Sequence, residues 1–362
     1  MESRLFGATK RRQRTAATAD APRYAGSVGR LRWLSWVLLA SCAPAPGASP
    51  APAPPPTRAS FAASLPAAPE SAPSEPPAPR RVDLRFQLNG RKFPIPLVRG
   101  SVGGEPVWML VDTGANSHVV ASWVVRKLGL PMRSLGEVGS DHTGRAVSAY
   151  AVDAVRIVIE GWGSLAGGPV LVTDVPDPIA RIGIGAFVSP QWLERDGDAL
   201  VLDLGAGVMR EAEWDEASRE LDGVSGREIG TSGVRLCRDA ASAIPGLEFV
   251  LSAQVDGHPV DLLLDTGAYR TDLLSGSPAG RALAVRAKPS SEQMYAASGL
   301  VRTSVVRSAR LRVGEWSLTR DVDVVPGIPD PACPRDGVVS MDVLESCTLL
   351  LGRTRLRGRC GP

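Results

Sequence analysis

One short motif occurs twice in this chain, each time at the end of an apolar run. Residues 107–115 read VWMLVDTGA, and residues 261–268 read DLLLDTGA. An apolar run of this length beside a glycine predicts a strand that is buried on both faces. A single carboxylate is costly to bury there without a partner. The repetition therefore indicates that Asp112 and Asp265 are neighbours in the folded chain.

Further landmarks surround both copies of the motif in the same order. A strand, a Gly-Gly or Asp-Gly hairpin turn and a second strand precede each copy. Downstream, HTG at 142–144 and ASG at 297–299 precede strands that end in a tryptophan, and FVSPQWLE at 187–194 matches VVSMDVLE at 338–345. Landmarks that recur in a fixed order indicate an internal duplication, so we expect two similar halves.

Two halves related by a two-fold axis would bring the same loop of each half to that axis. Carboxylates about 3 Å apart cannot both ionise, so Asp112 and Asp265 would share one proton and titrate as a pair. One carboxylate could then take a proton from water while the other protonates a carbonyl oxygen. This is general acid–base hydrolysis of an amide, and it needs neither a metal nor a cofactor.

The residues beside the two aspartates suit that chemistry. Gly114 and Gly267 allow the backbone to pass close to the carboxylates, because glycine has no Cβ. Thr113 and Thr266 offer hydroxyls that could lock the two loops together. The glycines of HTG and ASG lie at the turns of predicted hairpins that could fold over a bound peptide.

Together, these motifs resemble the retropepsin-like branch of the aspartic proteases, with both halves in one chain. The resemblance covers most of residues 85–361. It implies a mostly β, two-domain fold with pseudo-two-fold symmetry, the acid protease barrel, and an active site between the halves. It also implies that Asp112 and Asp265 are the catalytic pair. By the same resemblance, the active-site loops comprise Thr113, Gly114, Ala115, Thr266, Gly267 and Ala268, and the flaps carry Thr143, Gly144, Ser298 and Gly299.

The chain departs from the family pattern in one place in each half. The apolar-apolar-small triplet usually ends in glycine, whereas Ser189 and Ser340 end it here. Serine fits at these positions if the backbone is not in the left-handed conformation.

The N-terminal region predicts export and lipid anchoring. Arg30 and Arg32 precede a short apolar run, residues 33–41, which has the length of a signal-peptide core and is too short to cross a bilayer as a helix. The run ends in LASC, which resembles a bacterial lipobox, so we expect lipidation of Cys42. The segment before the apolar run is unusually long for the N-terminal region of a signal peptide. A start codon assigned too early would explain this length, and Val28 is a candidate start.

These features predict five segments. A signal peptide covers 1–41, and the lipidated cysteine with a Pro/Ala-rich tether covers 42–80. The N-terminal protease half covers 81–210, a linker 211–245 and the C-terminal half 246–362.

The remaining cysteines agree with an oxidising compartment. Without Cys42, four remain, and an even number in an exported chain is compatible with two disulfides in any of three connectivities. Cys347 and Cys360 flank a predicted hairpin that would set them opposite each other, so we favour the pairs Cys347–Cys360 and Cys237–Cys333.

Several function classes are disfavoured by composition. The net charge is only +3, and the arginines are spread along the chain, so there is no footprint of nucleic-acid binding. Three histidines without Cys-x-x-Cys or His-x-x-x-His spacing leave little from which to build a metal site. His118 is expected to be a packing residue, and there is no Gly-x-Ser-x-Gly elbow of a serine hydrolase.

The sequence thus predicts an aspartic endopeptidase that acts on peptides or proteins as a monomer and uses no cofactor. It would be attached to the membrane through Cys42, on the periplasmic face of the outer membrane, since Ala43 rather than Asp follows the cysteine. The alternative is a peptide-binding lipoprotein of the same fold with little hydrolytic activity. A two-carboxylate glycosidase is disfavoured, because symmetric acids would lie too close together for that chemistry.

Overall fold

The computed structural model describes residues 38–39, 80–141, 143, 145–165, 169–193, 198–229, 234–239, 246–292, 294–331 and 333–361. The expected signal peptide apart from residues 38–39, the lipidation site Cys42 and the tether up to residue 79 lie outside these residues, as do His142 and Gly144 of the first flap. No helix in the described part of the chain is long and apolar enough to cross a membrane.

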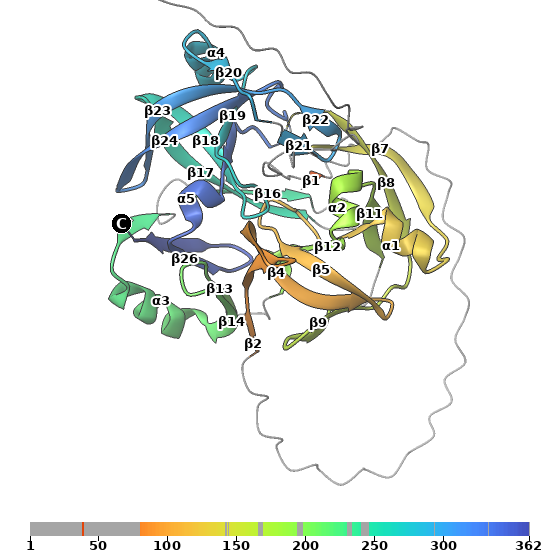
Figure 1. The fold of residues 1–362 in the computed structure, drawn as a ribbon. Coiled ribbons are helices and arrows are strands. Elements are labelled where there is room, and N and C mark those ends of the chain that lie inside the picture. Colours follow the sequence, from red (N-terminus) through yellow and green to blue (C-terminus); the bar gives the residue numbers. More distant parts are fainter. Residues whose placement is uncertain are drawn as a thin grey trace, which may run out of the picture. The chain divides into compact units, whose positions relative to one another are not determined.

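The first half is built on an 11-stranded sheet (Figure 1). The strand order is β1-β7-β8-β11-β6-β12-β5-β4-β9-β10, and β3 pairs with β4. The strands are β1 (Leu38–Leu39), β3 (Arg85–Leu88), β4 (Arg91–Val102), β5 (Glu105–Val111), β6 (Val119–Ala121), β7 (Arg133–Asp141), β8 (Ala146–Val152), β9 (Ile157–Ile159), β10 (Gly163–Ser164), β11 (Val170–Thr173) and β12 (Ile184–Val188).

The second half is built on an eight-stranded sheet and a separate hairpin (Figure 1). The order in the sheet is β16-β17-β18-β25-β19-β24-β23-β20. The strands are β16 (Val234–Asp239), β17 (Gly246–Val255), β18 (His258–Leu264), β19 (Asp272–Leu274), β20 (Lys288–Pro289), β23 (Ser304–Val313), β24 (Trp316–Val325) and β25 (Gly337–Val339), and the hairpin is β21 (Met294–Ala296) with β22 (Gly299–Val301).

The two halves repeat one strand arrangement, as the duplication predicts. In the first half, β5 pairs in parallel with β12, β12 is antiparallel to β6, and β6 is parallel to β11. In the second half, β18, β25, β19 and β24 repeat these relations in the same order. Because β5 and β18 lie between two neighbours and are buried, their apolar runs end inside the protein.

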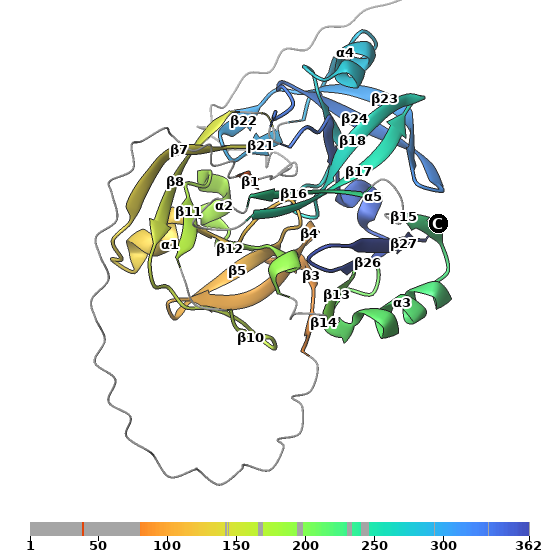
Figure 2. The same cartoon turned by 180° about the vertical axis from the view of Figure 1, so that it is seen from behind.

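A third sheet joins the halves, and Figure 2 shows it together with α3. Its order is β15-β27-β26-β13-β14-β2, and the join is the antiparallel pairing of β13 with β26. The strands are β2 (Arg81–Asp83), β13 (Asp198–Asp203), β14 (Val208–Glu213), β15 (Arg227–Ile229), β26 (Cys347–Leu351) and β27 (Leu356–Cys360). One apolar core cluster includes residues of both halves and of this sheet.

The helices are short, and α1 to α4 pack against strands of the three sheets. They are α1 (Ser122–Lys127), α2 (Asp177–Arg181), a 3-10 turn (Pro190–Trp192), α3 (Trp214–Gly223), α4 (Pro278–Ala284) and α5 (Met341–Leu344). The segment expected to be a linker carries α3, β15 and β16. Of these strands, β15 belongs to the joining sheet and β16 belongs to the sheet of the second half. Trp214, Ala217 and Leu221 form the buried face of α3.

The four cysteines lie in two pairs at disulfide distance, and these are the pairs that the sequence favours. Cys237 of β16 and Cys333 have Cα atoms 5.8 Å apart, and Cys347 and Cys360 have Cα atoms 4.0 Å apart. The second pair sits in opposite positions of the β26–β27 hairpin. The first pair joins an early and a late segment of the second half.

We predict that the Cys237–Cys333 disulfide stabilises the fold more than Cys347–Cys360, because it closes a loop of 96 rather than 13 residues. Reducing it alone should lower the free energy of unfolding by about 4–5 kcal/mol, against about 3 kcal/mol for the other. Urea unfolding before and after reduction measures both effects. Each is isolated in a double variant that keeps one disulfide, Cys347→Ala with Cys360→Ala or Cys237→Ala with Cys333→Ala. Equal losses would show that loop closure is not the source of the stabilisation.

Candidate active site

Asp112 and Asp265 begin equivalent loops at the ends of β5 and β18. The backbone N–H of Asp112 donates to the carbonyl oxygen of Val188 (2.9 Å), and that of Asp265 donates to Val339 (3.0 Å). Both aspartates are fully buried. The parallel neighbours β12 and β25 therefore fix where each apolar strand ends and where its carboxylate begins.

Each loop curls back so that its own backbone binds its aspartate. In both loops, the second and third residues after the aspartate donate backbone N–H groups to the Oδ1 atom. The distances are 2.9 Å from Gly114 and 3.0 Å from Ala115 to Asp112, and 2.8 Å from Gly267 and 3.1 Å from Ala268 to Asp265. Such bonds favour the ionised carboxylate and offset part of the cost of burying it.

The two loops are locked together by their threonines. The Thr113 hydroxyl donates to the carbonyl oxygen of Leu264 (2.8 Å) and accepts from the backbone N–H of Thr266 (3.0 Å). Reciprocally, the Thr266 hydroxyl donates to Val111 (2.7 Å) and accepts from the N–H of Thr113 (3.1 Å). All four bonds are buried and cross from one half to the other, so they bring the two aspartates together.

Gly114 and Gly267 occupy positions that no larger residue could take without a shift. A Cβ on Gly114 would lie 2.6 Å from Oδ1 of Asp265, and one on Gly267 would overlap the carboxylate of Asp112. Each glycine thus faces the aspartate of the other loop. The absence of a side chain is what allows the two loops to meet over the carboxylate pair.

Burial changes the proton affinity of both aspartates. It raises the pKa of Asp112 to about 6, against the lowering effect of its hydrogen bonds to Asp265 and to the loop backbone. Burial raises the pKa of Asp265 well above its ordinary value, and the neighbouring negative charge of Asp112 raises it further. The pair therefore holds one shared proton. The Oδ2 atoms of both residues accept no hydrogen bond within the described part of the chain.

Two supporting residues of the loops were not singled out from the sequence. The amide nitrogen of Gln191 lies 2.8 Å from the carbonyl oxygens of Ala115 and Leu247, so it ties the first loop to β17. Asp342 accepts from the backbone N–H (2.9 Å) and the hydroxyl (2.8 Å) of Thr271, just after the second loop. Gln191 and Asp342 occupy the same place in the repeat, two residues after Ser189 and Ser340, and that alignment was the available signal.

Ser189 and Ser340 take the place of the usual glycines with ordinary backbone angles. Their φ values are −78° and −128°, so neither residue needs the left-handed conformation. The N–H of Ser189 donates to Nδ1 of His118 (3.1 Å), and that of Ser340 donates to the hydroxyl of Thr271 (3.2 Å). Desolvation lowers the pKa of His118 to about 4, so this histidine is a neutral acceptor that supports the loop, in keeping with the expected packing role.

Two hairpins carry the predicted flap residues and lie side by side in Figure 1. Thr143 lies between β7 and β8, and Ser298 lies between β21 and β22, whose Gly299 has a φ of +114°. The positive φ explains glycine at that turn. Gly144, the expected tip of the first flap, is outside the described residues.

One cluster has the side chains of a metal site. Ligand atoms of Cys237, Cys333 and Glu248 lie within 4.8 Å of one another. The two sulfurs form a disulfide, however, and the carboxylate of Glu248 pairs with the buried guanidinium of Arg335 at 2.7 Å. With these groups engaged, the cluster does not offer a set of metal ligands.

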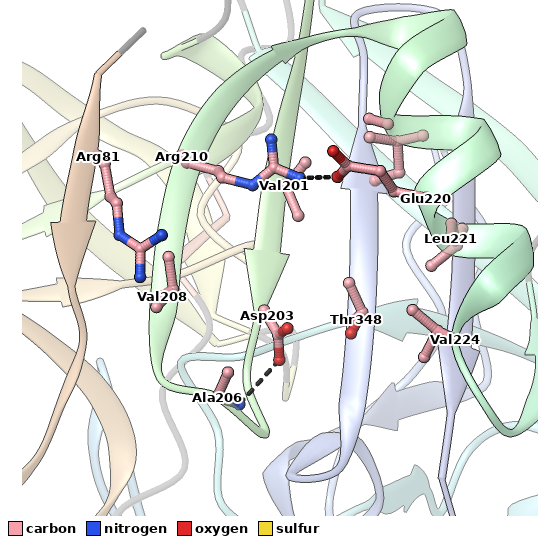
Figure 3. Close-up of a pocket in the computed structure, with 12 residues that line it drawn as sticks. Arg81, Val201, Asp203, Ala206, Val208, Arg210, Glu220, Leu221, Val224 and Thr348 are labelled. Carbon is pink, nitrogen blue, oxygen red and sulfur yellow. Dashed lines mark hydrogen bonds and ion pairs between the residues drawn. The ribbon is translucent and has the colours of Figure 1, made fainter.

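A pocket of about 210 Å³ is lined by residues of the joining sheet and of α3 (Figure 3). Arg81 of β2, Arg210 of β14 and Glu220 of α3 line it, and Arg210 forms an ion pair with Glu220. Asp203 accepts from the N–H of Ala206 at 2.8 Å. Arg210, Glu220 and Asp203 of this pocket are thus engaged, and none of the lining residues belongs to the aspartate loops.

A pair of buried aspartates on hydrogen-bonded Asp-Thr-Gly loops, brought together by two copies of one fold, defines an aspartic protease site. The aspartyl protease family model matches residues 98–186 and 251–343, one match in each half, and together these cover half of the chain. The chain therefore belongs to this aspartyl protease family. No curated protein matches the chain.

We predict that Asp265→Asn stabilises the fold at neutral pH. A carboxyl group whose pKa is raised by folding contributes full stability below its unfolded value, and stability falls as pH rises toward the folded value. Asparagine can keep the acceptor for Gly267 and Ala268 without the charge. We expect the melting temperature to be higher than that of the wild type by about 2–8 °C at pH 7 and equal to it near pH 4.

Thermal unfolding of both proteins at each pH is the measurement. The exposed residue Asp153 provides the control, and Asp153→Asn should show no such pH-dependent gain. A melting temperature of Asp265→Asn that stays at or below the wild-type value at pH 7 would contradict the raised pKa.

Proposed function

We propose that this protein is an aspartic endopeptidase, in which Asp112 and Asp265 activate water to hydrolyse peptide bonds. The observation that carries the proposal is the carboxylate pair itself, buried on two interlocked Asp-Thr-Gly loops. Each aspartate keeps one oxygen without a hydrogen-bond partner among the described residues. A protein that only bound peptides would have no need to bury two adjacent acids, which weakens the fold at neutral pH.

Sharing one proton gives the two aspartates complementary roles. Asp112, in its ionised form, takes a proton from water as the water oxygen bonds to the carbonyl carbon, while Asp265 gives its proton to the carbonyl oxygen. As the tetrahedral intermediate collapses, Asp112 passes its proton to the leaving nitrogen. Asp265 recovers a proton from a hydroxyl group, the C–N bond breaks, and the pair returns to its starting state.

The edge of β7 supports binding of an extended peptide. The short strand β1 pairs with this edge, with Leu38 opposite Asp141 and Leu39 opposite Ser140. An edge that pairs with an added segment binds peptide main chain by strand addition. Residues 38–39 fall within the expected signal peptide, so its removal would leave this edge of the first flap for the substrate.

We further propose that the protein is exported, lipid-anchored through Cys42 and active as a monomer. The lipobox-like LASC, the apolar run before it and the two cysteine pairs support export. The duplication supports a monomer, because one chain supplies both halves of the site. The substrate would then be a peptide or protein of the cell envelope.

Cleavage of a diverse peptide library by residues 81–362, from acidic to neutral pH, tests the proposed activity. We expect Asp112→Asn and Asp265→Asn each to lower cleavage by at least about 1000-fold, because neither carboxylate acts alone. A statine-type transition-state mimic should inhibit the wild type. If no peptide is cut at any pH and peptides bind equally to all three proteins, the molecule is a binding module.

The lipid anchor has its own test. Expressed with its natural N-terminus in a Gram-negative host, the wild type should fractionate with membranes, and its N-terminal peptide should carry the mass of acyl chains on Cys42. Cys42→Ala should abolish both. A Cys42→Ala protein that fractionates with membranes like the wild type would contradict the anchor.

A further inference from the structure

A hydrogen bond joins the two flap tips, from the backbone of the second flap to a side chain of the first. The N–H of Ser298 donates to Oδ2 of Asp141 at 3.1 Å. Asp141 is the last residue of β7, and Ser298 lies in the turn between β21 and β22. The bond spans 157 residues of sequence and connects the two halves.

The same carboxylate also builds the tip of its own flap. Its Oδ1 accepts from the N–H (3.0 Å) and the hydroxyl (2.6 Å) of Thr143 and from the N–H of Arg145 (3.3 Å). Only 1% of Asp141 is exposed. Charge-assisted bonds to several donors are what allow a carboxylate to be buried at a turn, so the group is fixed in place rather than solvated.

Other contacts place each flap against the opposite half. Tyr295 and Ala297 of the second flap pack on an apolar cluster of the first half that includes Val147 and Ala149 of β8. In the other direction, Thr143 of the first flap lies against Gly327, which is in the loop after β24. A Cβ added to Gly327 would be only 2.6 Å from the carbonyl oxygen of Thr143. The flap tips therefore cross over one another, and the hydrogen bond joins surfaces that are already packed.

We propose that Asp141 is a flap-positioning residue that latches the two flap tips, so that both flaps open and close as one unit. The latch is asymmetric. Asp141 lies three residues before the flap glycine of the first half, and the equivalent residue of the second half is Ala296. The latch pairs the carboxylate of Asp141 with the backbone N–H of Ser298, so it does not depend on the side chain of Ser298.

The isosteric substitution Asp141→Asn separates the latch from the turn. If the asparagine oxygen keeps the three donors of Thr143 and Arg145, its NH₂ group faces the N–H of Ser298, donor against donor. The opposite orientation would set the NH₂ group against the backbone N–H groups of Thr143 and Arg145, so two bonds would be lost to keep one. The substitution should thus release the second flap while the first flap keeps its turn.

Hydrogen exchange at the Ser298 amide, measured by NMR on the full chain without substrate, is the direct test. We expect exchange to be about 10- to 100-fold faster in Asp141→Asn than in the wild type, because the amide loses a bond to a charged group. Ser298→Ala is the matched control, since it keeps the N–H, and its residue-298 amide should exchange at the wild-type rate. Thr143→Val removes a bond within the first flap only and should leave Ser298 protection unchanged.

A statine-type inhibitor gives a second readout, because unlatched flaps open more often. Its association and dissociation rates should both rise in Asp141→Asn, with a smaller effect on the equilibrium constant. Equal Ser298 exchange in wild type and Asp141→Asn, with equal melting temperatures, would overturn the latch. If Asp141→Asn fails to fold, Ser298→Pro removes the donor instead, and wild-type inhibitor kinetics in that variant would also overturn it. Failure of proteolysis alone would leave the exchange result standing.

Discussion

The whole site depends on the reciprocal hydrogen bonds that the hydroxyl groups of Thr113 and Thr266 make between the two loops. An apolar interior tolerates two adjacent carboxylates only if the surrounding backbone satisfies its own hydrogen bonds. Thr113 and Thr266 achieve this because each hydroxyl donates into the opposite half and accepts from it, so the loops cannot separate without losing four buried bonds. That fixed spacing explains why glycines stand between the loops and why the two carboxylates share a proton.

The duplication supplies symmetry of position, whereas the chemistry around each aspartate has diverged. The first loop is supported by the amide of Gln191 and the second by the carboxylate of Asp342, whose pKa burial raises to about 7. The two halves also differ in charge at another pair of strands. Asp272 of β19 lies in register with Asp323 of β24, whereas β6 and β11, the corresponding strands of the first half, pair Val119 with Leu171. Acids therefore accumulate on the side of Asp265, and the charge of Asp272 adds to the effects that raise the pKa of Asp265.

Sequence reasoning could find what a local pattern repeats, and it missed what depends on distant partners. The aspartates, threonines and glycines of the two loops were predictable because the apolar strand and the motif occur together in both halves. The Cys347–Cys360 pair was predictable because a hairpin sets its ends opposite each other. The joining sheet was not, since β13 and β26 are adjacent only after both halves fold, and the expected linker gave no sign that α3 and β15 would complete it. The contact of Asp141 with the other half could not be predicted for a related reason. Its partner is a backbone N–H, which any residue except proline would supply.

Placing both halves in one chain makes the flap latch possible. If two identical chains supplied the halves, an aspartate at the position of Asp141 would stand at both flap tips, and two buried carboxylates would repel each other where the flaps meet. With Ala296 in the second copy, only one charge is present, and it faces a backbone donor instead of its own image. At the dyad, by contrast, the two identical acids do meet, and there they share one proton. A single chain can therefore keep the two-fold geometry that brings the aspartates together while it abandons that symmetry at the flap tips.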